Sequence, residues 1–239
     1  MIDEIAARMR RARSVFVLTG SGISAESGLP TFRGVGGLWR THRVEQLASP
    51  QGFARDPRLV WTWYNERRAA HRNAQPSAAH VALAQLETST ADFTLATQNV
   101  DSLHVRAGSR NVLELHGSLR VARCNRCGAS LDIDNGLPLE EIEHDCGGLF
   151  RPGVVWFGEP LPVREWELAA QAAARADVKL IVGTSAIVQP AASLALGNGA
   201  WVAEINPEET PISQHVDVSI RARASEVLPQ VDARLTVEA

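Results

Sequence analysis

The stretch that decides the fold of this 239-residue chain reads Val15-Phe16-Val17-Leu18-Thr19-Gly20-Ser21-Gly22-Ile23-Ser24-Ala25. It opens with a short, continuous apolar run, which is typical of a strand buried on both faces of a parallel sheet. A Gly-x-Gly-x-x-Ala turn follows. Glycines at such a turn let the backbone approach a pyrophosphate, and the next helix offers free N–H donors. The stretch therefore predicts a phosphate-binding strand–turn–helix unit, the alternative being a tight turn without a ligand.

Similar apolar runs outline the rest of a sheet. We expect further strands at residues 93–96, 112–115, 179–182, 200–205 and 216–220. Helical periodicity predicts helices at residues 3–13, 77–86, 163–176, 190–196 and 225–235. Strands that alternate with helices indicate an α/β fold with a doubly wound parallel sheet.

Two segments interrupt this alternation. Residues 31–76 contain no strand signal but a strong helical run at 57–73, and residues 118–152 hold all three cysteines and little periodicity. We interpret them as a helical and a cysteine-bearing insertion that together form a smaller domain. The sheet domain would then consist of residues 1–30, 77–117 and 153–239.

Composition narrows the function further. A net charge of -3 argues against nucleic acid as the main partner. Three cysteines, two of them close together, exclude a disulfide scaffold and favour a reducing, cytoplasmic location. The longest uncharged stretch, 180–203, is interrupted by polar residues and glycines, so no membrane segment is expected. The single lysine, Lys179, is far from any phosphate-binding Gly-Lys pattern.

Polar side chains follow two of the predicted strands. Gln98, Asn99 and Asp101 come after the strand at 93–96, and His116 closes the next one. Ligands bind at this edge of open α/β sheets, where amides and a carboxylate can bond a carboxamide and ribose hydroxyls. Asp101 could equally cap a helix. His116 is either a general base or a structural histidine.

The cysteines have the spacing of a zinc ribbon that lacks one ligand. Cys124 and Cys127 form a Cys-x2-Cys pair, and Cys146 lies where the second pair ends. Glu143 stands at the position of the missing cysteine. The candidates for the fourth ligand are Glu143, His144 and Asp145. Alternatively, the ribbon folds without metal.

One pair on the helix at 57–73 could bind an acid. Tyr64 and Arg67 are three residues apart and share a helix face, so a phenol and a guanidinium can bind a carboxylate together. The alternative is that Arg67 extends to solvent.

In this order, the motifs resemble the sirtuin family of NAD-dependent protein-lysine deacylases. The matching strings are residues 19–33, 97–101, 115–118, 124–127, 146–148, 151–152, 155–159, 183–185 and 204–206. The resemblance covers nearly the whole chain. It implies a Rossmann-like domain and a small domain of helices and a zinc ribbon, with NAD and an acylated-lysine protein meeting between them, in a monomer.

The resemblance also implies site residues. Those expected to bind NAD are Gly20, Ser21, Gly22, Ala25, Glu26, Phe32, Arg33, Trp39, Gln98, Asn99, Val100, Asp101, Gly183, Thr184, Ser185, Asn206 and Ala224. Those expected to act in catalysis are His116, Asn99 and Asp101. Those expected to contact the substrate are Ala48, Tyr64, Arg67, Val155, Phe157, Gly158 and Glu159. The zinc ligands would be Cys124, Cys127 and Cys146 with Glu143 or His144.

The mechanism implied is acyl transfer to ADP-ribose with release of nicotinamide, in which His116 is the general base on a ribose hydroxyl. Tyr64 and Arg67 are similar to the pair in family members that remove succinyl and malonyl groups, and Ala48 would widen the acyl pocket. We therefore expect activity on acetyl- and succinyl-lysine. The alternatives are an NAD-dependent protein ADP-ribosyltransferase and a non-catalytic NAD sensor.

Overall fold

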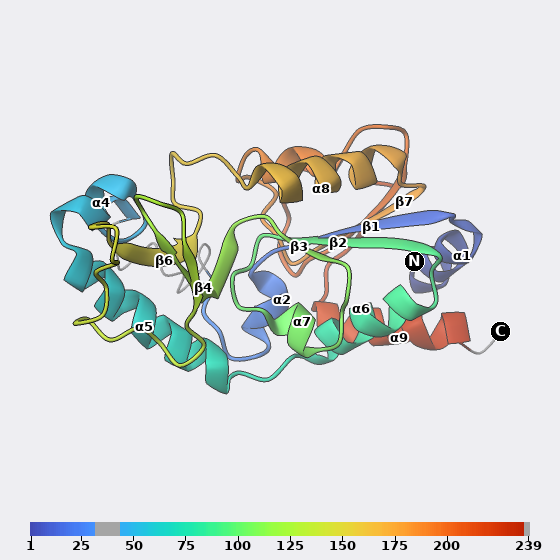
Figure 1. The fold of residues 1–239 in the computed structure, drawn as a ribbon. Coiled ribbons are helices and arrows are strands. Elements are labelled where there is room, and N and C mark those ends of the chain that lie inside the picture. Colours follow the sequence, from blue (N-terminus) through green and yellow to red (C-terminus); the bar gives the residue numbers. More distant parts are fainter. Residues whose placement is uncertain (32–43, 237–239) are drawn as a thin grey trace.

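The computed structural model of the protein describes residues 1–31 and 44–236. Three residues expected to bind NAD, Phe32, Arg33 and Trp39, lie outside the described residues. The described chain contains two sheets of different kinds. Figure 1 shows the larger sheet at the end of the molecule that carries both termini, and the smaller sheet at the opposite end.

The larger sheet has six strands, all paired in parallel, in the order β3-β2-β1-β7-β8-β9. Their bounds are β1 (Ser14–Thr19), β2 (Asp92–Thr97), β3 (Val112–Glu114), β7 (Val178–Val182), β8 (Trp201–Ile205) and β9 (Val218–Ile220). The chain order reverses between β1 and β7, as it does in doubly wound dinucleotide-binding sheets. This confirms the expected fold class.

Helices cover both faces of this sheet because its strands are apolar on both sides. They are α1 (Ile2–Arg11), α6 (Ala78–Thr88), α8 (Val163–Arg175) and α9 (Ala224–Thr236). In β1, Val15 and Val17 pack with α1, α6 and α9, whereas Phe16 and Leu18 pack with alanines of α8. Figure 1 shows α8 on one side of the sheet, and α6 and α9 on the other. No helix within residues 1–31 and 44–236 is long and apolar enough to cross a membrane.

The helix expected at 190–196 is only a 3₁₀ turn, η2 (Ala191–Leu194). Gly197 follows with φ of 90°, a left-handed conformation that does not continue a helix. The side chain of Lys179, which is only 1% exposed on β7, reaches this turn. Its Nζ donates hydrogen bonds to the carbonyl oxygens of Leu194, Leu196 and Gly197 at 3.1, 3.0 and 3.5 Å. The single lysine thus ties the turn to the sheet.

The smaller sheet is antiparallel and lies in the cysteine-bearing segment. Its order is β5-β4-β6, and its strands are β4 (Gly117–Cys124), β5 (Ser130–Asp132) and β6 (Phe150–Val154). Sequence periodicity does not predict these strands, because β5 is exposed along its length and β6 contains Pro152 and Gly153.

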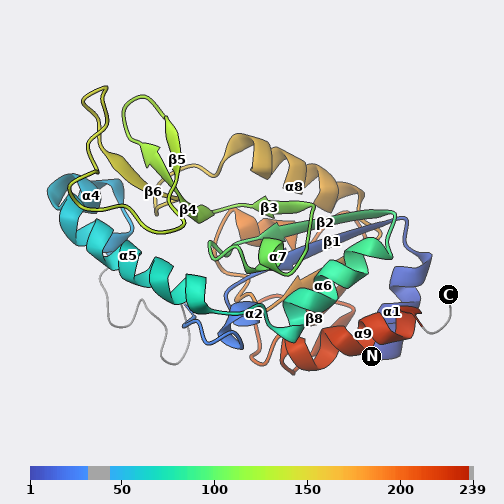
Figure 2. The ribbon, with the colours of Figure 1, turned by 60° about the horizontal axis from the view of Figure 1, so that its bottom comes forward.

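Three helices accompany the smaller sheet, and Figure 2 shows α5 beside it. They are α3 (Val44–Leu47), α4 (Pro50–Arg55) and α5 (Pro57–Asn73). The last of these matches the helix expected at 57–73, and it begins there because the Asp56 carboxylate accepts the N–H of Leu59 at 2.9 Å. Trp61, which is fully buried, donates its indole N–H to the Phe150 carbonyl oxygen at 2.9 Å and so holds α5 against β6.

Candidate active site

A cavity of about 620 Å³ lies where the two parts of the molecule meet. One wall consists of residues that directly follow strands of the parallel sheet, among them Gly20, Gln98, Gly183 and Asn206. The opposite wall comes from α5 and from residues 154–159 at the end of β6. The cavity therefore opens at the carboxyl edge of the sheet, at the point where the strand order reverses, which is where ligands bind in such folds.

The glycines after β1 and β7 allow two turns to pack backbone against backbone. A Cβ atom on Gly20 would lie 2.7 Å from Thr184 Cβ, and one on Gly22 would lie 2.7 Å from the Gly183 carbonyl oxygen. Gly183 itself has φ of 59°. The helix after the first turn, α2 (Gly22–Ala25), is a single turn. Close packing of the two turns therefore requires glycine at these positions, independently of any bound phosphate.

Asn99 and Asp101 belong to a buried hydrogen-bond chain beneath the cavity. The Asn99 amide donates to the Gly20 carbonyl oxygen and to Ser24 Oγ, both at 3.1 Å. Ser24 Oγ donates to the Asp101 carboxylate at 2.7 Å, which also accepts the Leu103 N–H at 2.9 Å. The Asp101 carboxylate therefore binds the first backbone N–H of α7 (Leu103–Arg106), but the N-cap residue of this helix is Ser102, so the interpretation of Asp101 as the N-cap is wrong by one residue. Burial raises the pKa of Asp101.

Of the described residues expected to bind NAD, most line the cavity, but three do not. Asp101, Glu26 and Ala224 are absent from its wall. The Glu26 carboxylate instead accepts the backbone N–H of Ser225 at 3.2 Å and also the Ser225 hydroxyl, near the start of α9. The side chain of Gln98 lies in the wall and donates to Thr184 Oγ1 at 2.8 Å.

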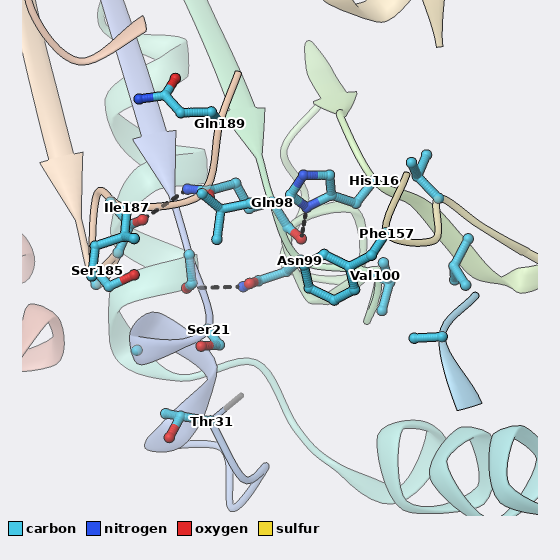
Figure 3. Close-up of a pocket in the computed structure, with 18 of the residues that line it drawn as sticks. Ser21, Thr31, Gln98, Asn99, Val100, His116, Phe157, Ser185, Ile187 and Gln189 are labelled. Atoms are coloured by element: carbon cyan, nitrogen blue, oxygen red, sulfur yellow. Dashed lines mark hydrogen bonds between the residues drawn. The ribbon is translucent and has the colours of Figure 1, made fainter. Parts of the chain in front are cut away.

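His116 lies in the cavity wall with a defined tautomer (Figure 3). Its Nδ1 lies 2.9 Å from the Gln98 carbonyl oxygen. Since a carbonyl oxygen only accepts, Nδ1 carries the proton and Nε2 keeps its lone pair. Burial lowers the pKa of His116, against the opposing effect of the Gln98 hydrogen bond. The imidazole is therefore neutral at pH 7, which is the state that a general base needs.

Tyr64 and Arg67 both face the cavity from α5. Arg67 is only 8% exposed, so it does not extend to solvent, and its guanidinium carbon lies 4.6 Å from the centre of the Trp63 ring. Burial lowers the pKa of Arg67 to about 10 and raises that of Tyr64 to about 12. At neutral pH the pair therefore presents one cation and one protonated phenol. Among the described lining residues Arg67 is the one permanent cation.

The expected substrate segment also lies in the wall. Val155, Phe157, Gly158 and Glu159 line the cavity, as does Ala48, whose carbonyl oxygen accepts the Phe157 N–H at 3.1 Å. The Glu159 carboxylate is held within the protein. It pairs with the Arg151 guanidinium and accepts the Trp156 backbone N–H at 2.8 Å.

A second group of functional side chains lies away from the cavity. Cys124, Cys127, His144 and Cys146 have ligand atoms that all lie within 4.8 Å of one another. Four ligand atoms around a tetrahedral zinc ion are about 3.3–3.8 Å apart, so this Cys3His set fits zinc. Glu143 is not a member of the group, and its backbone forms a β-bridge with Leu149. Of the fourth ligands that the sequence left open, the structure therefore favours His144.

The Cys124 thiol is also in a state that suits a metal. The backbone N–H groups of Cys127 and Arg126 point at its sulfur and lower its pKa to about 6, whereas burial raises the pKa of the Cys146 thiol. His144 Nδ1 lies 3.8 Å from the Cys127 sulfur, so this imidazole nitrogen faces the cysteines. A thiolate and an unprotonated imidazole are the forms that bind zinc.

Sequence reasoning did not single out several residues of the cavity wall. They are Trp63, Val154, Leu161, Ile187, Val188, Gln189, Pro190 and the residues from Pro207 to Pro211. Residues 187–190 lie in the segment that follows β7 and residues 207–211 in the segment that follows β8, so the same strand-end argument that identified Gln98 could have found them.

Comparison with known proteins assigns the family. A sequence model described as "Sir2 family" matches residues 20–190. The chain belongs to the Sir2 family. A relative from Pyrobaculum aerophilum, named NAD-dependent protein deacylase 2, is 51% identical over 233 residues, which cover 95% of this chain and 93% of the relative.

Solved Sir2 structures share the whole fold. A mutant Sir2 homologue in complex with ADP-ribose is 47% identical, with a TM-score of 0.96 and coverage of 100% of this chain and 98% of the other. A Sir2 structure described with a p53 peptide and NAD+ is 30% identical, with a TM-score of 0.88 and coverage of 99% of each chain. The Sir2 fold thus includes both the parallel sheet and the smaller domain of this protein.

Proposed function

We propose that this Sir2-family protein is an NAD-dependent protein-lysine deacylase that transfers the acyl group to ADP-ribose and releases nicotinamide. The observation that carries the proposal is His116, which directs a lone pair from a neutral imidazole at the edge of a cavity bounded by both domains. Family membership, with relatives named as deacylases, supports the same activity.

The cavity has the features that a dinucleotide and an acylated peptide require. The turns at Gly20 and Gly183 keep the backbone close to the cavity, and the amide of Gln98 is held in the wall by Thr184. In the opposite wall Val155 continues from β6 and can lie along a substrate strand, whereas residues 157–159 form a turn closed by the Glu159 N–H and the Trp156 carbonyl oxygen at 3.0 Å. Asn99 lines the cavity, and Asp101 lies behind it, linked to Asn99 through the Ser24 hydroxyl.

In this proposal His116 accepts a proton from a ribose hydroxyl through Nε2. Bound NAD supplies an electrophilic ribose carbon and nicotinamide as leaving group. A positioned base typically contributes a factor of about 10²–10⁴ to the rate. The Gln98 carbonyl oxygen fixes the tautomer and holds the ring against rotation. The Cys3His group lies outside the cavity wall, so a zinc ion there would act on the stability of the smaller domain.

We further propose that the enzyme removes succinyl and malonyl groups as well as acetyl groups. Arg67 gives the cavity a buried cation, and Tyr64 places a protonated phenol beside it. A carboxylate at the end of an acyl chain can accept hydrogen bonds from both. A neutral acetyl group fits the same space without using them.

The experiment supplies NAD and peptides of one sequence that carry acetyl-, succinyl- or malonyl-lysine, and identifies the products by mass spectrometry. The expected products are free lysine peptide, nicotinamide and O-acyl-ADP-ribose. His116→Ala should lose turnover while it retains NAD binding by calorimetry. ADP-ribosylated protein without deacylation would contradict the proposal in favour of an ADP-ribosyltransferase, and NAD binding without any turnover would indicate a sensor.

A further inference from the structure

The hydroxyl of Tyr64 has a partner that determines which way its proton points. The indole N–H of Trp156 lies 3.0 Å from the Tyr64 oxygen, and both side chains are buried, at 2% and 5% exposure. Among the described residues Trp156 is the one hydrogen-bond partner that this hydroxyl has. An indole N–H can only donate, so the phenol oxygen accepts there, and its own proton is available to another acceptor.

We propose that Trp156 is a positioning residue for acyl-chain recognition: its indole N–H occupies the acceptor side of the Tyr64 hydroxyl and directs the phenol proton toward a carboxylate in the cavity. This inference rests on the proposed succinyl and malonyl specificity. Tyr64 then acts as an oriented donor beside Arg67, and the acyl carboxylate receives a hydroxyl and a guanidinium from one helix face.

The surroundings of Trp156 hold the indole in this orientation. The guanidinium carbon of Arg151 lies 3.5 Å from the centre of the Trp156 ring, and the Phe53 ring centre lies 5.4 Å from it. Arg151 also pairs with Glu159, whose carboxylate accepts the backbone N–H of Trp156. Both the backbone and the ring of Trp156 are therefore fixed before substrate arrives, which limits the entropy lost on binding.

Burial keeps the Tyr64 hydroxyl protonated and therefore able to donate. Burial raises its pKa to about 12, although the Trp156 hydrogen bond and the nearby guanidinium groups of Arg67 and Arg151 act in the opposite direction. The phenol stays protonated throughout the range in which an enzyme is assayed. Since Tyr64 is the single tyrosine of the chain, its spectroscopic signals are unambiguous.

The test is a double-mutant cycle with Trp156→Phe and Tyr64→Phe, alone and combined. Phenylalanine keeps an aromatic ring for Arg151 but removes the N–H. Each variant is assayed on peptides of one sequence with acetyl- or succinyl-lysine, and kcat and KM are recorded separately. Trp166→Phe is the control for loss of an indole, because Trp166 is a partly buried residue of α8 that is not part of the cavity wall.

Trp156→Phe should raise KM for the succinyl peptide about fivefold relative to the acetyl peptide, the effect of one neutral hydrogen bond. The same change in the Tyr64→Phe background should leave the succinyl-to-acetyl ratio unaltered, because no hydroxyl remains to be oriented. Equal losses on both peptides, or the same loss with and without the Tyr64 hydroxyl, would overturn the inference.

A second measurement does not depend on turnover. With ¹³C at the tyrosine ζ position, the protein gives one resonance that reports hydrogen bonding at the Tyr64 hydroxyl. The succinyl peptide should shift this resonance in the wild type, the acetyl peptide should not, and Trp156→Phe should reduce the shift. If the wild type removes succinyl groups and Trp156→Phe has the same succinyl-to-acetyl ratio as the wild type, this inference is wrong but the proposed specificity stands. No desuccinylation and no shift in the wild type defeats the proposed specificity together with it.

Discussion

Replacing Arg67 by methionine should separate the two acyl activities. Methionine retains much of the apolar stem but removes the guanidinium that faces the cavity. An acyl chain that ends in a carboxylate would lose its ionic partner and become an uncompensated charge at a buried site. An acetyl group makes no such contact and should be turned over at a similar rate.

The burial of Arg67 sets the size of the effect. Its pKa falls from 12.5 to about 10, so keeping this cation in the protein costs about 3 kcal/mol. An incoming carboxylate offsets part of that cost, and hydrogen bonds to charged groups contribute about 1.5–3 kcal/mol. We therefore expect kcat/KM for succinyl-lysine to fall about 10- to 150-fold. Acetyl-lysine should change less than about threefold, roughly 0.6 kcal/mol on the same scale.

The assay measures kcat/KM on acetyl and succinyl peptides of one sequence at saturating NAD. Arg67→Lys tests geometry, because lysine keeps the charge but not the paired donors, and should give an intermediate succinyl rate. Arg72→Met, an exposed arginine on the same helix, is the matched control and should leave both rates unaltered. A parallel loss on both substrates in Arg67→Met would refute the role of Arg67 in binding the acyl carboxylate.

Three further predictions concern other parts of the molecule. Because burial lowers the pKa of His116 and the base must be neutral, the midpoint of the acid limb of kcat/KM should lie below the ordinary histidine pKa of about 6.5. A midpoint above that value would contradict the assignment of His116 as the base. Protein purified without chelator should hold one zinc ion per chain by metal analysis. His144→Ala should lower both the zinc content and the Tm, whereas Glu143→Ala should lower neither. Loss of zinc in Glu143→Ala but not in His144→Ala would make Glu143 the ligand. Lys179→Met should lower the free energy of unfolding, measured in urea, by about 1–3 kcal/mol, because carbonyl groups such as that of Leu194 lose their hydrogen-bond donor. An unchanged urea midpoint would contradict this prediction and show that water replaces the ammonium group.

The parallel sheet could be predicted because its strands lie in predominantly apolar runs, with alternate residues such as Val17 and Leu18 packing under helices on opposite faces. The carboxyl-edge argument likewise placed Gln98 and His116 in one cavity wall. The smaller sheet could not be found in this way. Of its strands, β5 is short and exposed and β6 contains Pro152 and Gly153, and the position of the sheet depends on contacts with α5 that no local pattern encodes.

The details of the site required the structure for similar reasons. The positions of Glu26 and Ala224 outside the cavity wall depend on where α9 begins in space, which the sequence motif does not specify. His144 and Glu143 are neighbours in sequence, and only the course of the chain toward Leu149 decides which faces the cysteines. Trp156 and Tyr64 are 92 residues apart in sequence, and neither the segment around Trp156 nor that around Tyr64 indicates that the two side chains are in contact.

Lys179 has a consequence for work with the protein itself. The chain's only side-chain amine lies under η2 and is engaged by backbone carbonyl oxygens. Reactive acyl thioesters and amine-directed labels therefore find no accessible lysine on the folded protein. If the proposed activity is correct, the substrate carries acyl-lysine whereas the folded enzyme has no lysine that can be acylated. Every acyl-lysine signal in a reaction mixture therefore originates from the substrate.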